Sequence, residues 1–576
     1  MTLFRKRGMS MSFQPLPIGI DDFEKLITEG YYYVDKSLLI KELLDKKGAV
    51  NLFTRPRRFG KSLNMSMLQC FFENSGDDEY NKQKATLFNG LKIMNSGENY
   101  LKHFGQYPVI NLTFKSSKQP TWELAYGCIK EEIGREYARH KEVLNILDLP
   151  DERRRYLDIL NQQGRMQDYI SSLRFLVDCL QKKYQSQVII LIDEYDVPLE
   201  NAYFSGFYTE MIHLIRSILE SSLKGNPGLA FAVMTGCLRF TKESIFTGLN
   251  NLEMISILNA SYDEYFGFTQ SEIDIMLDFY QLSHKRDELK EWYDGYRFGN
   301  VEVYNPWSVT NYIKSLKIYT EDFPRPYWAN TSSNSIVRNL VERADASIRA
   351  ELEHLIAGGT IEKPIHEDIT YDSVDKSEDN LWNFLFFTGY LKQLSSRMEM
   401  ETQYVTLAIP NHEIRYIYRN TISNWFYDEV KAKDLSLLYK AMLSGNTELF
   451  QQELSALLRI SISYMDSKEA FYHGFLLGVL GNLKDCLIKS NREAGDGRLD
   501  IAVLPEDIRK TPIIIELKVS DTFKNMEMFC NNALQQIFEK KYYDLLEDEG
   551  YSDVRCYGIS FFKKQCLIKT ESKNLF

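Results

Sequence analysis

One stretch constrains the fold of this chain more than any other, Asn51-Leu-Phe-Thr-Arg-Pro-Arg-Arg-Phe-Gly-Lys-Ser62. The apolar residues 49–53 predict a short buried strand, and residues 63–72 predict a helix. Pro56 and Gly60 break regular structure between them, directly before a lysine and a serine. A strand, a tight loop, Gly-Lys-Ser and a helix form the context of a phosphate-binding loop, because the N–H groups and dipole at a helix start attract anions.

The loop departs from the usual pattern at its first position, where Arg55 stands in place of glycine. Glycine permits a positive φ and a close approach to phosphate, and arginine does neither easily. In a functional loop, Lys61 is expected to reach the β/γ-phosphates and the Ser62 hydroxyl to hold Mg²⁺. A helix start with a solvated lysine is the alternative interpretation, so a second motif has to decide.

The second motif follows the most apolar predicted strand, Val188–Ile192, which runs straight into Asp193 and Glu194. Open α/β sheets bind ligands at the carboxyl ends of their strands. Asp193 is expected to hold Mg²⁺ through water, and Glu194 to polarise an attacking water beside the γ-phosphate. Solvated acids at a strand end are the alternative for this pair alone. In this order and on these elements, the loop and the pair predict an ATP site.

Other residues extend the predicted nucleotide site. Thr235 ends the next buried strand and is a candidate to sense the γ-phosphate, although an ordinary strand-ending threonine fits equally well. Arg57, Arg58 and Arg239 are candidates to neutralise phosphate charge, with solvated side chains as the default. The predicted nucleotide-binding set is Arg57, Arg58, Phe59, Gly60, Lys61, Ser62, Leu63, Asp193 and Thr235.

The alternation of strands and helices predicts an α/β fold with a doubly wound, mostly parallel sheet. The predicted domains are a flexible tail (1–14), an ATPase core (15–260), a largely helical, aromatic-rich connector (261–464) and a small α/β domain (465–570). Within the connector, residues 303–307 are predicted to be extended, and residues 381–391 to form a helix or a pair of strands.

The small C-terminal α/β domain contains a second polar constellation on a predicted hairpin. Asp500 on one strand faces Glu516 and Lys518 on the next, and the latter two share a face because they are two residues apart. Asp500 and Glu516 can chelate a divalent metal, while Lys518 can position or activate the attacking water. Glu469 on the preceding helix is a candidate to complete the metal shell. Oxygen ligands favour Mg²⁺ or Mn²⁺, and this chemistry hydrolyses phosphodiesters.

The alternative for these C-terminal residues is a half-exposed sheet edge without a site. His473 lies four residues after Glu469 on the same helical face, where a packed or solvent-bonded histidine is favoured over a metal ligand.

Composition limits the possible partners and location. The net charge of −11 argues against a chain coated by non-specific nucleic-acid binding, but it leaves room for a local basic groove. Eight scattered cysteines without a C-x-x-C pair indicate reduced thiols. No secretory signal and no apolar run near the ~18 residues of a membrane span are present, so the protein is predicted to be cytoplasmic and without a membrane partner.

Two motifs, Arg55-Pro-Arg-Arg-Phe-Gly-Lys-Ser-Leu63 and Leu191-Ile-Asp-Glu-Tyr-Asp196, resemble those of the AAA-ATPase-like family of bacterial proteins. The likeness extends to residues 247–252, 292–296, 304–308 and 388–391. In that family the Arg-Pro-Arg-Arg form of the loop is usual. The resemblance implies a P-loop ATPase core with a helical or winged-helix lid, and no known substrate.

The C-terminal motifs resemble the PD-(D/E)XK nuclease superfamily, in the branch found behind AAA-ATPase-like domains. They are Gly497-Arg-Leu-Asp500, Ile515-Glu-Leu-Lys518 and Ala533-Leu-Gln-Gln-Ile-Phe-Glu-Lys-Lys-Tyr542. Leu499 replaces the proline that usually precedes the aspartate. The resemblance implies that Gln535 or Gln536, and Tyr542 or Tyr543, line the cleft.

The favoured hypothesis is therefore an ATPase switch that controls a metal-dependent nuclease acting on DNA or RNA. The first alternative is a nucleotide-dependent module that binds nucleic acid or a protein without cutting, and the second is a scaffold with vestigial sites. The sequence leaves open whether ATP is hydrolysed or only bound, which nucleic acid is used and whether the chain forms oligomers in which a neighbour's arginine completes the ATP site.

Overall fold

The computed structural model describes residues 14–238, 245–246, 249–330, 346–367, 377–420, 433–461, 469–481, 483–494, 497–547 and 550–575. Arg239 and nearly all of the predicted N-terminal tail lie outside these residues. The chain divides into two compact units, Met1–Asn334 with Thr360–Ile417, and Ser335–Gly359 with Tyr418–Phe576. Within the described residues, no helix has the length and apolar character needed to cross a membrane.

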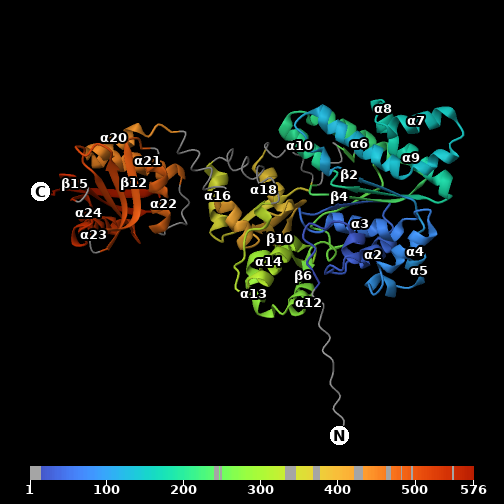
Figure 1. The fold of residues 1–576 in the computed structure, drawn as a ribbon, viewed down its shortest axis with the longest axis horizontal. Helices are drawn as coiled ribbons and strands as arrows, with labels where there is room; N and C mark the ends of the chain where they lie inside the picture. Colours follow the sequence, from blue (N-terminus) through green and yellow to red (C-terminus); the bar gives the residue numbers. More distant parts are fainter. Residues whose placement is uncertain are drawn as a thin grey trace, which may run out of the picture. The chain divides into compact units, whose positions relative to one another are not determined.

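The first unit is built on a five-stranded parallel sheet in the order β2-β3-β4-β1-β5. Its strands are β1 (Val50–Thr54), β2 (Val109–Thr113), β3 (Val188–Asp193), β4 (Leu229–Gly236) and β5 (Leu252–Ile255). Every residue of β1 and β3 is buried, as expected for strands covered on both faces. Helices lie on both sides of the sheet (Figure 1), including α2 (Leu38–Lys46), α3 (Lys61–Phe72), α6 (Trp122–Arg139) and α9 (Ser172–Tyr184). The predicted α/β fold with a parallel sheet is confirmed.

The register of this sheet gathers the polar strand ends at one edge. Phe53 of β1 is level with Thr235 of β4, and Ile192 of β3 is level with Met234. Because the strands are parallel, Asp193 and Thr235 therefore emerge beside the loop that follows β1.

The rest of the first unit packs two small sheets and several helices beside this core. One sheet has the order β6-β8-β7, and the other β10-β11-β9. Their strands are β6 (Phe268–Thr269), β7 (Tyr296–Phe298), β8 (Val301–Tyr304), β9 (Ile361–Ile365), β10 (Lys392–Glu399) and β11 (Thr402–Ala408). The helices include α12 (Gln270–Tyr280), α13 (Arg286–Tyr293), α14 (Pro306–Ile318) and α18 (Glu378–Phe387).

In this region, one detail differs from the sequence-based prediction, and a second decides between two predicted forms. Residues 303–307 were predicted to be extended, but only Val303 and Tyr304 are in a strand, and α14 begins at Pro306. The side chain of Asn305 caps this helix, and proline suits the first helical position because its missing N–H is not needed there. Of the two forms considered for residues 381–391, the helix is correct up to Phe387.

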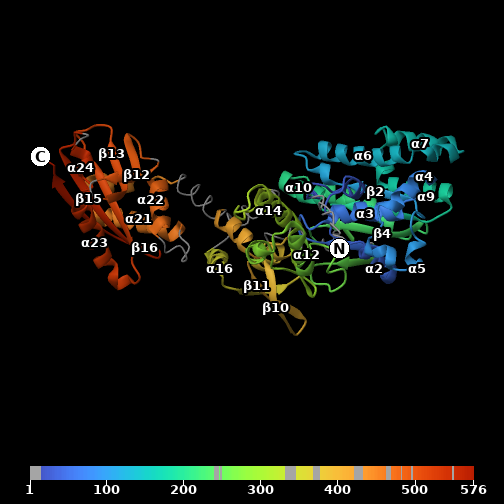
Figure 2. The ribbon, with the colours of Figure 1, turned by 60° about the horizontal axis from the view of Figure 1, so that its bottom comes forward.

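The second unit contains a mixed five-stranded sheet in the order β12-β13-β14-β15-β16. Its strands are β12 (Cys486–Ala494), β13 (Gly497–Pro505), β14 (Ile513–Val519), β15 (Asp553–Phe562) and β16 (Gln565–Asn574). Only β14 and β15 run parallel, and α23 (Met526–Glu539) lies between them in the chain. Helices α21 (Thr447–Ser461) and α22 (Glu469–Leu480) pack on one face (Figure 2), together with α20 (Ser436–Ser444), and α23 packs on the other.

Candidate active sites

The loop after β1 has the backbone of a helix-start anion site. Gly60 has φ of 83° and precedes Lys61, the first residue of α3. Glycine suits this position because the left-handed conformation is strained for a residue with a Cβ atom. The first N–H groups of α3 and its positive dipole end therefore face the space in front of the loop.

Arg55, at the position where glycine is usual, points into the protein. Its side chain is fully buried, and one guanidinium nitrogen donates to the carbonyls of Thr54 at 2.9 Å and Ile255 at 2.8 Å. The guanidinium carbon also lies 5.2 Å from the ring centroids of both Phe266 and Phe298. Burial lowers the pKa of Arg55 to about 9, so it remains a cation at neutral pH. Arginine is tolerated here because its side chain leaves the phosphate side of the loop unobstructed.

Lys61 is held inside the loop. Its Nζ donates to the carbonyl oxygens of Arg55 and Pro56, both at 2.9 Å, and lies 3.6 Å from the Sγ of Cys237. These are partners that a lysine can exchange for phosphate oxygens with little movement of the backbone.

Asp193 connects the loop to two strands. Its Oδ2 accepts from the Ser62 hydroxyl at 2.5 Å, and its Oδ1 accepts from the Thr235 hydroxyl. The Thr235 oxygen in turn accepts from the backbone N–H of Glu194 at 3.4 Å. Glu194 has φ of 55°, and burial together with the Asp193 carboxylate raises its pKa. The structure thus brings Ser62, Asp193, Glu194 and Thr235 together.

The remaining loop residues have different environments. Arg57 forms an ion pair with Glu200, whereas Arg58 is exposed and lies over the ring of Trp307. Phe59 is fully buried, with its ring 4.9 Å from that of Tyr296.

A cavity of about 470 Å³ lies in front of the loop, which is within the usual range for small-molecule sites. The loop contributes all of Arg57 to Leu63 to its wall, and Glu194 also lines it. Apolar and aromatic residues that the sequence did not indicate complete the wall, among them Ile20, Tyr32, Val34, Phe268, Met276 and Trp307. Of these, only Trp307 lies in a motif that had been noted. The cavity is lined both by hydrogen-bond donors that can bind phosphate and by apolar side chains, and this combination fits a nucleotide.

In the second unit, the hairpin brings the predicted metal ligands together. Ile501 pairs with Ile515, so Asp500 comes level with Glu516 on the neighbouring strand. The Oδ2 of Asp500 accepts from the backbone N–H of Leu517 at 2.9 Å. Lys518 lies with its Nζ 3.3 Å from Glu516 Oε1.

Glu516 is the most constrained of these groups, with 1% of its surface exposed. Its Oε1 accepts from Lys518 and from Gln536, whereas its buried Oε2 has no hydrogen-bond partner in the described chain. Burial and the adjacent Asp500 raise the pKa of Glu516. A buried carboxylate with a free oxygen beside a second carboxylate fits a divalent cation such as Mg²⁺ or Mn²⁺.

The neighbouring helices resolve two alternatives. Gln536 approaches Glu516 and lies 3.1 Å from the Tyr542 hydroxyl, while Gln535 turns outward to Glu539. Gln536 and Tyr542 are therefore the pair at the site.

Helix α22 reaches the site through His473, whose Nε2 lies 3.1 Å from the backbone carbonyl of Asp500. Glu469 is exposed at the start of this helix and makes no hydrogen bond or ion pair with Asp500 or Glu516 in the described chain. Across the described ranges, no three His, Cys, Asp or Glu side chains are arranged to hold a metal. Metal binding by Glu469 therefore stays a prediction.

Comparison with known proteins supports both resemblances. Residues 17–246 match the AAA-ATPase-like family, described as predicted AAA-ATPase, and residues 467–571 match the PD-(D/E)XK nuclease superfamily. An uncharacterized protein encoded in the vnfD 5′ region of Azotobacter chroococcum mcd 1 is 25% identical over 563 residues, which cover 96% of this chain and 97% of that protein.

Proposed function

We propose that this chain, which carries an AAA-ATPase-like domain and a PD-(D/E)XK nuclease superfamily domain, binds and hydrolyses ATP and uses the nucleotide to control metal-dependent cleavage of a phosphodiester. The observation that carries the proposal is a cavity that has apolar wall residues and is also lined by Lys61 and Ser62, with Asp193 accepting from the Ser62 hydroxyl.

In the nucleotide site, Lys61 exchanges the carbonyls of Arg55 and Pro56 for β- and γ-phosphate oxygens, while the N–H groups at the start of α3 bind the same phosphates. Ser62 and Asp193 would hold Mg²⁺, which when bound neutralises phosphate charge. Glu194 lies beside Asp193 and lines the cavity, where it can orient the attacking water and accept a proton.

Equilibrium binding of ATP to the full-length chain, with Mg²⁺ present, tests this half. Lys61→Ala is expected to bind ATP at least about tenfold more weakly, because it loses charge-assisted hydrogen bonds to phosphate. Lys41→Ala, on the exposed part of α2, is the matched control. Equal affinity of the two variants would contradict the nucleotide site.

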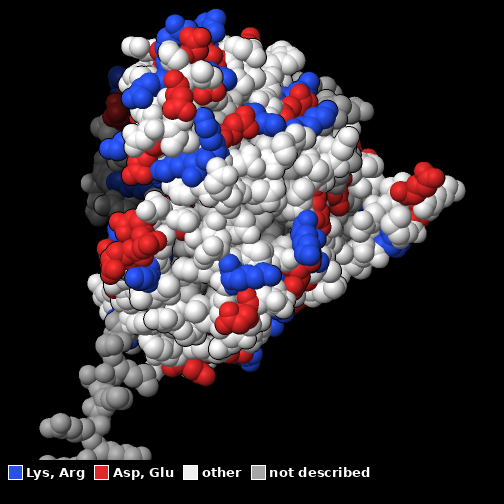
Figure 3. Space-filling view, turned by 90° about the vertical axis from the view of Figure 1, so that its right-hand side faces the viewer, with Lys and Arg blue, Asp and Glu red and all other residues white. Residues whose placement is uncertain are grey.

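In the C-terminal site, Asp500 and Glu516 would hold Mg²⁺ or Mn²⁺, which when bound acts as a Lewis acid on the phosphodiester. Lys518 stabilises the phosphate charge and positions the attacking water, while Gln536 orients Glu516. On the displayed face of the first unit, basic side chains are mixed with acidic ones around an uncharged centre (Figure 3). That pattern is unlike the basic patch of a nucleic-acid surface.

A cleavage assay tests the second half. Wild type and Glu516→Gln are incubated with single- and double-stranded DNA and RNA, with Mg²⁺ or Mn²⁺, and with or without ATP. Cleavage by wild type alone, altered by ATP, is expected. Equal cleavage by Glu516→Gln would exclude Glu516 as the metal-holding group.

The alternative is a nucleotide-dependent module that binds nucleic acid or a protein without cutting. The exposed, separate position of Glu469 favours it, because among the described residues only two carboxylates then meet at the site. Metal binding that is lost in Glu516→Gln, together with intact nucleic acid in every reaction, would support this alternative.

A further inference from the structure

Arg58 and Trp307 form a contact on the wall of the nucleotide cavity. The guanidinium carbon of Arg58 lies 4.3 Å from the Trp307 ring centroid, and both residues line the cavity. This is the distance of a cation–π interaction, which contributes roughly 0.5–1 kcal/mol at an exposed site. Arg58 is exposed, so its guanidinium remains accessible to a ligand while it rests on the ring.

Hydrogen bonds at both ends of the residue fix the ring of Trp307. The indole N–H donates to the Tyr327 carbonyl at 3.3 Å, and the backbone N–H donates to Asn305 Oδ1 at 3.0 Å. Trp307 lies in the first turn of α14, where Asn305 is the cap. The ring face that Arg58 meets therefore belongs to a rigid element.

The other described arginines of the loop already have partners within the protein. Arg55 is buried behind the loop, and Arg57 is ion-paired with Glu200. Arg58 lines the same cavity as Glu194, the residue that follows β3 and is expected beside the terminal phosphate. Its charge is thus available on a cavity wall that it shares with Glu194.

We propose that Trp307 is a positioning residue that holds Arg58 against the cavity wall near Glu194, so that Arg58 binds the terminal phosphate of a nucleoside triphosphate within the same chain. The Arg58–Trp307 pair then distinguishes ATP from ADP without an arginine from a second copy. This inference rests on the proposed nucleotide site and adds how that site recognises its ligand.

Equilibrium binding of two probes to the full-length chain tests the pair, namely ADP and the β,γ-imido analogue of ATP, each with Mg²⁺. Arg58→Ala is expected to weaken the analogue about tenfold, and Trp307→Leu about fivefold, with less than a twofold change for ADP. Trp307→Phe keeps a ring face and Arg58→Lys keeps a cation, so both should retain part of the preference. The double variant Arg58→Ala with Trp307→Leu should be no weaker than Arg58→Ala.

Tyr404→Leu is the matched control, because it removes a comparable contact with Arg397, at 4.7 Å, on β10 and β11 away from the cavity. Equal losses for both probes in Trp307→Leu, or losses that add in the double variant, would overturn the proposal. If wild type binds neither probe, the proposed function fails. If wild type binds both but Trp307→Leu matches Tyr404→Leu, only this inference fails.

Dilution tests whether Arg58 acts within one chain. The ratio of the two affinities is expected to stay constant over a hundredfold range of protein concentration. A preference for the analogue that grows with protein concentration would assign the terminal phosphate contact to a second copy instead.

Discussion

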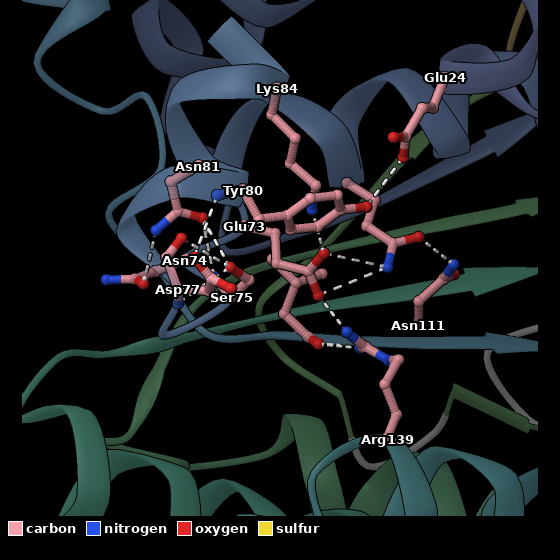
Figure 4. Close-up of polar contacts among 12 residues, drawn as sticks. Glu24, Glu73, Asn74, Ser75, Asp77, Tyr80, Asn81, Lys84, Asn111 and Arg139 are labelled. Atoms are coloured by element: carbon pink, nitrogen blue, oxygen red, sulfur yellow. Dashed lines mark hydrogen bonds and ion pairs between the residues drawn. The ribbon is translucent and has the colours of Figure 1, made fainter.

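Helix α3 has charged residues at both ends, and these residues differ in the kind of partner they have. At its start, Lys61 and Ser62 face a cavity, and their protein partners are groups that a phosphate or a metal can replace. At its end, Glu73 is buried and accepts from Lys84 of α4 (Asp78–Thr86) at 2.7 Å and from Arg139 of α6 (Figure 4). Burial alone would raise the pKa of Glu73, but the two cations lower it.

The ion-paired cluster around Glu73 also covers the β2 edge of the main sheet. On the edge strand β2, the N–H of Asn111 donates to Glu136 at 2.9 Å, and Arg139 donates to the carbonyl of Val109. Side chains from α6 thus occupy backbone groups that could otherwise pair with another strand. The comparison teaches that charges with complete internal partners anchor the fold, whereas charges with replaceable partners indicate a ligand site.

The largest effect is expected from removing Glu73. Glu73→Ala leaves the buried Lys84 without its carboxylate and removes one of the two carboxylate partners of Arg139, so the free energy of unfolding should fall by about 3–5 kcal/mol. Urea denaturation measures this loss, with the exposed Glu123→Ala on α6 as control. ATP affinity of the folded fraction should be unchanged. A loss below about 1 kcal/mol would remove the distinction between the two ends.

The reverse pattern is expected for Lys61→Ala. Its free energy of unfolding should change by no more than about 1–2 kcal/mol, because Lys61 itself lines the cavity, so water can enter the space its side chain leaves and hydrate the two carbonyls. Its ATP affinity should nevertheless fall. A stability loss as large as that of Glu73→Ala would show that Lys61 is chiefly structural.

Arg55 lies between these two cases, since it is buried like Glu73 but belongs to the loop. Arg55→Lys is expected to lower the free energy of unfolding by about 1–2 kcal/mol, because lysine cannot keep the flat contact with Phe266 and Phe298. Binding of ATP and ADP should weaken equally, since Arg55 shapes the loop and does not line the cavity. Selective weakening of ATP binding would instead place Arg55 at the terminal phosphate.

A smaller, pH-dependent effect is expected from Glu413, which is fully buried and accepts from Ser308 at 2.9 Å and from the Trp328 N–H at 2.8 Å. Burial raises its pKa from 4.5 to about 8. The folded state therefore keeps a proton that the unfolded state loses, so this contribution to stability is complete below pH 4.5 and is lost as the pH rises to 8.

Glu413→Gln removes this titration. Thermal melting should show a higher Tm than wild type at pH 8, and the difference should shrink toward pH 4.5. A constant difference across this range would mean that Glu413 is not protonated in the folded protein.

Local sequence patterns predicted much of the fold. The Asn51–Ser62 stretch and the Val188–Glu194 stretch identified the loop, the central strands and the polar strand ends, because each feature is set by neighbouring residues. The C-terminal hairpin was predicted for the same reason. Strands β12 and β16 were not predicted. After Cys486–Ile488 the residues of β12 are mostly polar, and so is the end of β16, as is common at sheet edges.

The sequence by itself determined the residue types of both candidate sites and the elements that carry them, since strand and helix periodicity depends on near neighbours. Only the tertiary structure decided which side chains meet: that Arg55 turns into the core, that Gln536 rather than Gln535 reaches Glu516, and that Arg58 rests on Trp307. The physical reason is distance along the chain. Arg58 and Trp307, like Glu73 and Arg139, are brought together by packing between elements, and no local pattern records that packing.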